Sequence, residues 1–320
     1  MINTTPSRSL AMELVRVTEA AAISAAKYVG KGDKIGGDGA AVDAMRAVLS
    51  TIDIAGVVII GEGEKDEAPM LFNGEKLGTG HGPVVDIAVD PVEGTTFLAY
   101  GQPNSISVIG VSDKGSMWDP GDSFYMNKIV VGHKAKHAID ITLSTEENLL
   151  NIAKALDKSI DDLTVFVLNK PRHIDLINKI KEVGARVVIQ SDGDVMGALL
   201  AIIPDTCIDV LMGIGGTPEG VITACAVKSL NGGMQGMRCP QKEDEIKLLK
   251  SKKIDINEVL TLDTLVNSDN AFFSATGITD GSFLSGVKID SSNENITTHS
   301  IAMHSATNTI RYIKGIHKVK

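Results

Sequence analysis

The sequence predicts an α/β fold, and two features of its hydrophobic pattern support this prediction. Two segments with apolar residues at helical spacing, 9–29 and 39–50, are followed by several short apolar runs bounded by Gly, Pro or Asp. After Ser144, segments with helical and strand patterns alternate. The N-terminal part is therefore predicted to be α+β, and the C-terminal part to be a three-layer α/β unit.

The individual elements follow from the same pattern. The first helix should end at Gly30, because glycine is common directly after a helix. The N-terminal strands are predicted at 57–60, 84–89, 106–111 and 128–131. The alternating part has predicted helices at 144–156, 172–183, 194–202 and 218–230, and predicted strands at 163–168, 185–190 and 208–213. A short helix in an exposed connection is expected within 241–253, and two or three strands within 270–320.

Length and composition limit the possible functions. The 320 residues suffice for one large domain or two smaller ones, and we expect domains at 1–140 and 141–320. The net charge of -9 disfavours binding to nucleic acid or to anionic membranes. It also suits an anionic substrate poorly, unless metal ions supply a local positive field.

The sequence shows neither a membrane-spanning segment nor a secretion signal. No apolar run reaches the roughly 18 residues of a membrane span, and residues 1–18 lack the apolar stretch of a signal peptide. The three cysteines, Cys207, Cys225 and Cys239, match no zinc-binding pattern. We expect them to be buried, reduced thiols, which favours a cytoplasmic protein.

The strongest chemical motif is the run Asp-Pro-Val-Glu-Gly-Thr-Thr at 90–96. An apolar strand leads to Asp90, Pro91 is expected to end the strand, and Glu93 follows three residues after Asp90. Two carboxylates this close repel each other unless they share divalent cations. Gly94 permits a close backbone approach, and Thr95 offers a hydroxyl and an N–H group to a phosphate. Such a set suits metal-assisted phosphoryl transfer; the alternative is a polar turn in which Asp90 caps backbone groups.

Two further acidic motifs lie nearer the N-terminus. Glu62 stands between two glycines after an apolar strand, so its carboxylate can project into a cleft, whereas Glu64, Asp66 and Glu67 are expected on a solvated loop face. Asp38 precedes the second predicted helix. It is either the N-cap of that helix or, given the glycines and lysines around it, part of a site that includes Lys34.

The C-terminal part has polar turns after three predicted strands. The glycine-rich run 213–220 passes from strand to helix, which suits phosphate or metal, and Pro218 fits a first helical turn; a structural turn is the alternative. Two other turns, at 170–173 and 192–194, also follow strands, where ligands bind in open α/β sheets. Lys170 and Arg172 are candidate anchors for a second phosphate. We expect His173 to be only a surface neighbour.

Together these motifs resemble those of a known enzyme family. The run at 90–96 is similar to the Asp-Pro-Ile-Asp-Gly-Thr signature of lithium-sensitive, metal-dependent phosphatases, which include inositol monophosphatases and fructose-1,6-bisphosphatases. The motifs in order along the chain, from about residue 10 to residue 317, resemble the bacterial class II fructose-1,6-bisphosphatases. The runs that carry this closer resemblance are 32–41, 61–64, 170–173, 192–195 and 215–220.

The resemblance implies a layered α-β-α-β-α sandwich, with most metal ligands in the N-terminal domain and the substrate site completed by the C-terminal domain. It implies Mg²⁺ or Mn²⁺ held by Asp38, Glu62, Asp90, Glu93 and Glu219. It implies a catalytic pair in which Asp38 helps Thr95 to position and deprotonate the attacking water. The implied substrate contacts are Glu93, Gly94, Thr95, Tyr125, Lys170, Pro171, Arg172, Asp192, Gly193, Asp194 and Gly216.

The expected activity is hydrolysis of the 1-phosphate of fructose 1,6-bisphosphate in gluconeogenesis. The alternatives are a phosphatase for sedoheptulose bisphosphate or an inositol phosphate, and a non-catalytic sugar-phosphate-binding protein. We expect a homo-oligomer, either a dimer or a tetramer. The chain departs from the family pattern at His304, where arginine is usual, at 232–237, and after Cys239. These departures concern subunit contacts or fine substrate preference, because they leave the expected metal ligands unchanged.

Overall fold

The computed structural model describes residues 10–63, 70–290, 292 and 294–318. The acidic residues Glu64, Asp66 and Glu67 lie outside the described residues. The chain divides into two compact units: unit 1 consists of Met1–Met117 and Ser268–Lys320, and unit 2 of Trp118–Asn267. This division differs from the expected boundary at residue 140, because the C-terminal strands pair with N-terminal ones in the sheet of unit 1.

Unit 1 is built on a mixed sheet of eight strands with the order β12-β13-β11-β4-β3-β1-β2, in which β14 also pairs with β13. The parallel pair β1–β3 is flanked by antiparallel neighbours. The strands are β1 (Ala55–Ile60), β2 (Lys76–Leu77), β3 (Val84–Glu93), β4 (Ile106–Asp113), β11 (Phe272–Gly277), β12 (Lys288–Ile289), β13 (Asn295–His304) and β14 (Thr309–Lys318).

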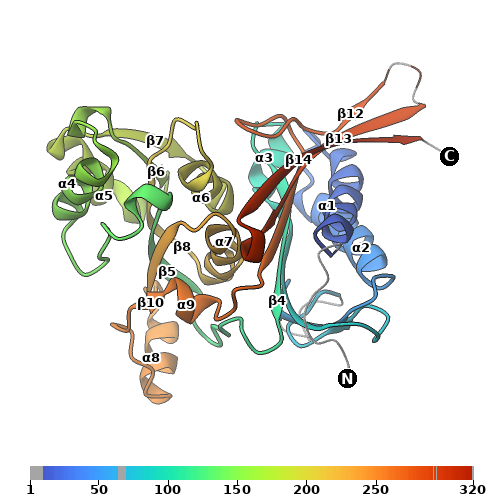
Figure 1. The fold of residues 1–320 in the computed structure, drawn as a ribbon, viewed down its shortest axis with the longest axis horizontal. Helices are drawn as coiled ribbons and strands as arrows, with labels where there is room; N and C mark the ends of the chain where they lie inside the picture. Colours follow the sequence, from blue (N-terminus) through green and yellow to red (C-terminus); the bar gives the residue numbers. More distant parts are fainter. Residues whose placement is uncertain (1–9, 64–69, 291, 293, 319–320) are drawn as a thin grey trace. The chain divides into compact units, whose positions relative to one another are not determined.

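Two helices cover one face of this sheet, α1 (Leu10–Ala26) and α2 (Lys34–Leu49) (Figure 1). Their small and aliphatic side chains, such as Leu14, Ala21 and Met45, are fully buried against the strands. At burial values of roughly 1.5–3 kcal/mol for a fully buried large aliphatic side chain, this contact is a main stabilising element of the unit. The short helix α3 (Thr95–Tyr100) follows β3.

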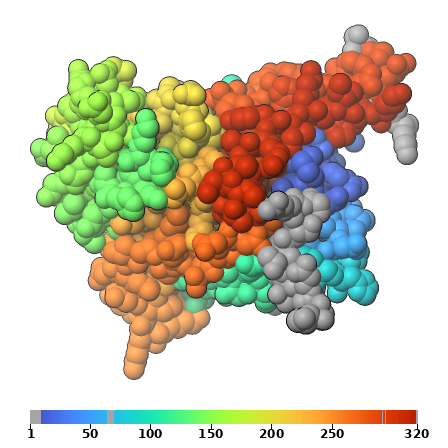
Figure 2. Space-filling model, viewed as in Figure 1, coloured from blue at the N-terminus to red at the C-terminus, as the bar shows by residue number. Residues whose placement is uncertain are grey.

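The last strand of unit 1, β14, forms part of the surface seen in the space-filling view (red, Figure 2). Its residues are alternately more and less exposed, so that Ile313 packs on the core while Tyr312 and Ile316 are 59% and 67% exposed. The 3₁₀ turn Ser305–Thr307 joins β13 to β14.

Unit 2 contains a second mixed sheet, of six strands in the order β10-β9-β5-β8-β6-β7. The strands are β5 (Tyr125–Val131), β6 (Thr164–Leu168), β7 (Arg186–Gln190), β8 (Val210–Gly216), β9 (Gly233–Arg238) and β10 (Leu260–Thr261). The helices are α4 (Thr145–Leu156), α5 (Ile174–Val183), α6 (Asp194–Ile202), α7 (Thr217–Ser229), α8 (Glu243–Ser251) and α9 (Leu262–Leu265), with 3₁₀ turns at His133–Ala135, Ile160–Asp162 and Pro171–His173.

The alternation of side chains along β6 makes this unit three layers thick. Val165 and Val167 belong to a buried cluster with α4 and α5. Phe166, which lies between them, points to the other face of the sheet and packs on Gly197 of α6. Any larger residue at position 197 would overlap the Phe166 ring. Helices α4 and α5 therefore cover one face of the sheet and α6 and α7 the other, which confirms the predicted α/β class (Figure 1).

Several predicted boundaries were wrong for identifiable reasons. Helix α2 begins at Lys34, five residues before the predicted start, because Asp33 caps it by accepting the Gly36 N–H at 2.8 Å. Strand β3 continues beyond Pro91 to Glu93. Strand β8 includes the glycines expected to form a turn. The run 232–237 lies largely in β9, a strand that the pattern did not predict, and the described residues of 270–320 form four strands instead of two or three.

The cysteines agree with the expectation only in part. All three are free thiols, but Cys225 alone is buried, whereas Cys207 is exposed and Cys239 is half-buried. Among the helices of the described residues, none combines the length and apolar character needed to cross a bilayer.

Candidate active site

The structure brings two expected carboxylates of unit 1 close enough to influence each other. Asp38 lies one turn inside α2, so it is not the N-cap, and Glu62 follows the end of β1. The backbone of Glu62 is fixed by a hydrogen bond in which its N–H donates to the carbonyl oxygen of Leu71 at 2.9 Å. Burial raises the pKa of Asp38. Burial, and then the negative charge of Asp38, raise the pKa of Glu62 to about 7.

A bulge near the end of β3 sets the positions of the next two carboxylates. Asp90 pairs with Val108 and Glu93 with Ile106, so two residues of β3 lie opposite the single residue Ser107 of β4, and β3 has one extra residue. Within a bulge, Pro91 does not need to donate a backbone hydrogen bond to the neighbouring strand. The strand can therefore continue past this proline. One oxygen of Asp90 accepts the Val92 N–H at 3.0 Å, and Glu93 is only 4% exposed. The backbone-capping alternative for Asp90 therefore holds for one of its oxygens.

The residues after Glu93 form a sharp turn into α3. Gly94 has φ 83° and ψ 51°, a left-handed conformation, and a Cβ atom there would lie 2.8 Å from the Phe97 ring. Thr95 is the first residue of α3 and is half-buried. Lys34 donates to the Thr96 hydroxyl at 2.9 Å, which connects the starts of α2 and α3.

The expected pair of Thr95 and Asp38 is not joined by a hydrogen bond within the described residues. The two helices that carry them, α3 and α2, do pack together. Any proton transfer between the two side chains therefore needs a bridging water or a small shift in position.

In unit 2, Arg172 is held firmly after β6. Its Nε and Nη2 atoms donate to the carbonyl oxygen of Ile214 at 3.0 and 2.8 Å. Its guanidinium carbon lies 5.2 Å from the centre of the Tyr125 ring, within the range of a cation–π contact. Lys170 precedes it as the N-cap of the 3₁₀ turn that begins with Pro171. Arg172 is thus a positioned cation and not a solvated surface charge.

The prediction that His173 is a surface neighbour was wrong. Its side chain is 1% exposed, and it connects β6 to β8. Nδ1 lies 2.7 Å from the carbonyl oxygen of Leu168, and Nε2 lies 2.7 Å from the N–H of Ile214. Since that N–H can only donate, Nε2 is an acceptor and the proton is on Nδ1. Burial lowers the pKa of His173, which keeps this neutral form.

The turn 192–194 leads into α6 through Gly193, which is left-handed at φ 89°. Asp194, the first residue of α6, is 8% exposed. Its carboxylate forms a short ion pair with Lys128 of β5, whose ammonium group also donates to the carbonyl oxygen of Gly216 at 2.9 Å. Lys128 itself is 2% exposed.

Glu219 lies in the first turn of α7, after Thr217 and Pro218. Burial raises the pKa of its carboxyl group, while the positive charge of Lys128 opposes this shift. Its Oε2 atom is buried and has no hydrogen-bond partner among the described residues. A buried carboxylate oxygen without a partner is costly, and a bound cation would satisfy it.

The carboxylate oxygens of these residues are suitable ligands for a hard divalent cation, but within the described residues they do not together form a complete coordination site. Carboxylates with raised pKa values, as at Asp38, Glu62 and Glu219, are those that a nearby cation would restore to the charged form. In the part of the chain that the structure describes, however, no group of three or more His, Cys, Asp and Glu side chains is arranged to hold a metal ion.

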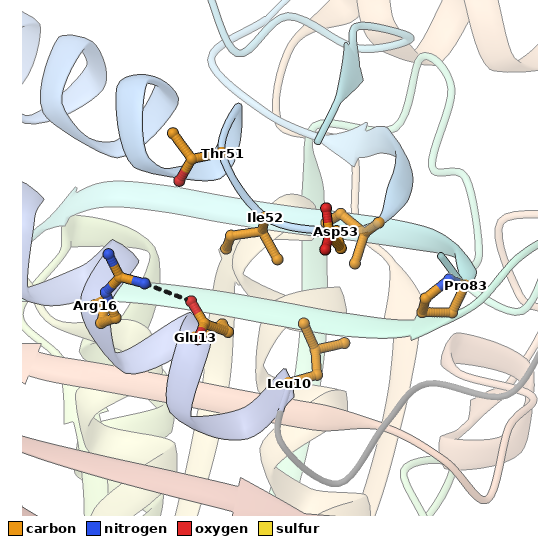
Figure 3. A pocket seen from close by; sticks show the side chains of 8 residues that line it. Leu10, Glu13, Arg16, Thr51, Ile52, Asp53 and Pro83 are labelled. Atoms are coloured by element: carbon orange, nitrogen blue, oxygen red, sulfur yellow. Dashed lines mark hydrogen bonds and ion pairs between the residues drawn. The ribbon is translucent and has the colours of Figure 1, made fainter. Parts of the chain in front are cut away.

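A separate hollow of about 390 Å³ lies in unit 1, where strands β1 and β3 begin (Figure 3). It is lined by residues that precede β1 and β3, including Asp53 and Pro83, whereas Glu62 and Glu93 lie at the other ends of these strands. Its charged groups already have partners: Arg16 bonds Glu13 at 2.7 Å, and Thr79 donates to Asp53 at 3.0 Å. The hollow is therefore distinct from the predicted site.

The unusual His304 is an internal residue of unit 1. It is 5% exposed, stacks on Phe272 with ring centres 4.1 Å apart, and its Nε2 lies 2.9 Å from the side-chain oxygen of Asn270. This local role differs from that of an arginine, which would need room for a longer charged side chain.

Sequence reasoning missed two residues that organise unit 2, Lys128 and His173. For Lys128 a signal was available, because it shares the alternating face of Met126 and Val130 and both are fully buried. For His173 no local pattern exists, since its partner Ile214 is 41 residues away.

Comparison with known proteins agrees with the motifs. Residues 8–317 match the family model described as bacterial fructose-1,6-bisphosphatase, glpX-encoded. The chain is 45% identical over 324 aligned positions to fructose-1,6-bisphosphatase 1 class 2 of Escherichia coli K12, covering 97% of this chain and 95% of the relative. The same values apply to the class 2 fructose-1,6-bisphosphatases of Escherichia coli O6:H1 and Shigella flexneri. The chain belongs to the family of bacterial, glpX-encoded fructose-1,6-bisphosphatases.

Proposed function

We propose that the chain hydrolyses the 1-phosphate of fructose 1,6-bisphosphate, giving fructose 6-phosphate and phosphate, and that it serves gluconeogenesis. The observation that carries the proposal is the similarity to class 2 fructose-1,6-bisphosphatases over 97% of the chain. The raised pKa of Glu62 beside Asp38 supports it independently, because such a pair suits a site that binds cations.

We propose a divalent cation, Mg²⁺ or Mn²⁺, as the cofactor. Its ligands would be Asp38, Glu62, Asp90, Glu93 and Glu219. When bound, the cation supplies Lewis acidity and neutralises phosphate charge.

The residues of the chain supply position and proton transfer. Thr95 would hold the attacking water through its hydroxyl, and Asp38 would accept the proton, directly or through a water. Gly94 presents backbone to the phosphate without a side chain in the way. A hydroxyl is a weak base, so the contribution of Thr95 is mainly the orientation of the water.

We assign the 6-phosphate to Lys170 and Arg172. Arg172 is already fixed by Ile214 and Tyr125, so little side-chain freedom is lost when a phosphate binds. Binding energy from this remote group can then stabilise the transition state at the reacting phosphate. The remaining assigned contacts to substrate are Glu93, Tyr125, Pro171, Asp192, Gly193, Asp194 and Gly216, with Lys34 as a further candidate. We further propose a cytoplasmic homo-oligomer, a dimer or a tetramer.

A phosphate-release assay tests the proposal. The purified protein, stripped of metal, is given fructose 1,6-bisphosphate, sedoheptulose 1,7-bisphosphate or inositol 1-phosphate, with Mg²⁺, with Mn²⁺, or with excess chelator. We expect fructose 1,6-bisphosphate to be the best substrate and release to stop in chelator. Preference for another substrate would refute the substrate assignment, turnover in chelator would refute the cation, and no release with any pair would refute the phosphatase activity.

A further inference from the structure

Lys128 is the one lysine or arginine that is buried among the described residues. Its side chain starts from the middle of β5 and ends at the starts of two helices. The ammonium group bonds the carboxylate of Asp194, at the start of α6, and the carbonyl oxygen of Gly216, which directly precedes α7. One cation thus connects three elements of unit 2.

Two carboxylates act on this ammonium group: Asp194 pairs with it, and Glu219 is close enough for the charge of Lys128 to influence its pKa. A Cβ atom on Gly215 would lie 1.9 Å from Oδ2 of Asp194, and one on Gly216 would lie 1.8 Å from Oε2 of Glu219. The two carboxylates therefore rest against the backbone of adjacent glycines. Without a cation they would repel each other across that backbone.

Stability alone does not account for an ammonium group in this place. Removing a charge from water costs several kcal/mol, and replacing a buried ion pair by apolar residues of equal volume is often neutral or stabilising. What the pair does provide is a defined position for Asp194 and for Gly216. A buried ion pair with good geometry fixes its partners more narrowly than apolar packing does.

We infer that Lys128 is a positioning residue for the sugar-bisphosphate site, which holds the Asp194 carboxylate and the Gly216 carbonyl group in the arrangement that receives the sugar. This inference rests on the proposed function, which assigns both residues to the substrate. Lys128 acts through them and does not take part in the reaction itself. Its loss should therefore weaken substrate binding more than it slows the chemical step.

The test compares Lys128→Met and Lys128→Gln with the wild-type protein under the metal conditions that give best turnover. Lys128→Met should raise KM for fructose 1,6-bisphosphate by roughly 10- to 100-fold, the scale of a lost charge-assisted hydrogen bond, with a smaller fall in kcat. Lys128→Gln keeps an N–H donor and should recover part of that loss. If Lys128→Met fails to fold, judged by circular dichroism and the thermal midpoint, Lys128→Gln carries the test.

Lys228 provides the matched control. It is another largely buried lysine of unit 2, its side chain 10% exposed, and it bonds Asp263 at 2.8 Å. Lys228→Met should lower the thermal midpoint and leave KM unchanged. A cycle with Asp194→Asn adds a second measure: because Lys128 acts through Asp194, the double variant with Lys128→Gln should lose less than the product of the two single losses.

The outcomes separate the inference from the proposed function. A folded Lys128 variant with KM within twofold of wild type would overturn the inference while the proposed function stands. A double variant whose fold loss equals the product of the two single losses would also overturn the action of Lys128 through Asp194. Absence of turnover in the wild-type protein would defeat the proposed function, and the inference with it.

Discussion

At the scale of single residues, Glu62 is a carboxyl group whose protonation differs from its ordinary state. Its pKa is raised to about 7 by burial and by the charge of Asp38. In the metal-free protein, a pKa raised above its unfolded value contributes stability that is present below about pH 4.5 and is lost as the pH rises through about 7.

Glu62→Gln removes this titration, so its effect on stability should depend on pH. Relative to wild type, the metal-free variant should gain stability as the pH rises from about 4.5 to about 7, and the gain should level off above that range. The measurement is the urea midpoint of both proteins across this range, with chelator present. A difference that stays constant with pH would show that Glu62 keeps an ordinary pKa.

Thr95 should act through its hydroxyl group. Thr95→Ala should reduce kcat by roughly 10²- to 10⁴-fold, the scale of a lost acid–base contribution, with KM little changed. Thr95→Ser keeps the hydroxyl and should retain more activity. Steady-state kinetics of both variants decide the matter, and equal losses in the two would exclude a catalytic hydroxyl.

At the scale of elements, Arg172 belongs to a turn that β6 and β8 position together. Arg172→Ala should lower kcat/KM for fructose 1,6-bisphosphate by roughly 10- to 150-fold, the range expected for a charge-assisted hydrogen bond. The loss for a sugar monophosphate should be much smaller, and activation by metal should be unchanged. Arg172→Lys should recover only part, because the planar fork is lost. Equal losses for both substrates would contradict the assignment to the 6-phosphate.

The start of α2 allows the structural and chemical roles of its aspartates to be separated. Asp33 is the N-cap, so Asp33→Ala should cost about 1 kcal/mol of stability and leave kcat nearly unchanged. Asp38 lies a turn further on, and Asp38→Asn should lower kcat by a factor similar to that of Thr95→Ala. Thermal midpoints and kcat of both variants provide the comparison. Loss of stability without loss of kcat in Asp38→Asn would make Asp38 a structural residue.

These elements also show what the sequence could predict. The helices and strands of the alternating part were predicted within a few residues, because their hydrophobic periods are regular and their caps and glycines are local signals. Pro91 was misread because a bulge, which depends on the partner strand β4, removes its usual effect on a ladder.

For the candidate site, too, the sequence indicated residues that share a short motif, but not contacts between distant parts of the chain. The sequence singled out Asp90 and Glu93 because they share one short motif, and the structure adds that Asp38 lies close enough to Glu62 to raise its pKa. The glycines at 213–216 were predicted as a turn, yet they form the end of a strand, because β5 pairs along their whole length. The alternating pattern of β5 indicates that Lys128 is buried, but it does not indicate its partners, which lie 66 and 88 positions away.

At the scale of the whole molecule, the chain order and the two units do not coincide. Unit 2 is one continuous stretch, Trp118–Asn267, with its own sheet and its own buried cluster. A fragment of residues 118–267 should therefore fold alone, with a cooperative thermal transition and near-ultraviolet dichroism from Trp118 and Tyr125, its one tryptophan and one tyrosine. A fragment of residues 1–117 lacks four strands of its sheet and should aggregate. A fragment 118–267 without a cooperative transition would show that unit 2 depends on unit 1.

The split of unit 1 also affects how the protein emerges from the ribosome. Strand β4 needs β11 as its neighbour, but the 150 residues of unit 2 are translated between them. At about 5–20 residues per second, the open edge of β4 is exposed for roughly 8–30 s in the nascent chain. The nascent chain is therefore most vulnerable to wrong strand pairing in this interval, and slower translation of unit 2 would lower the yield of folded protein.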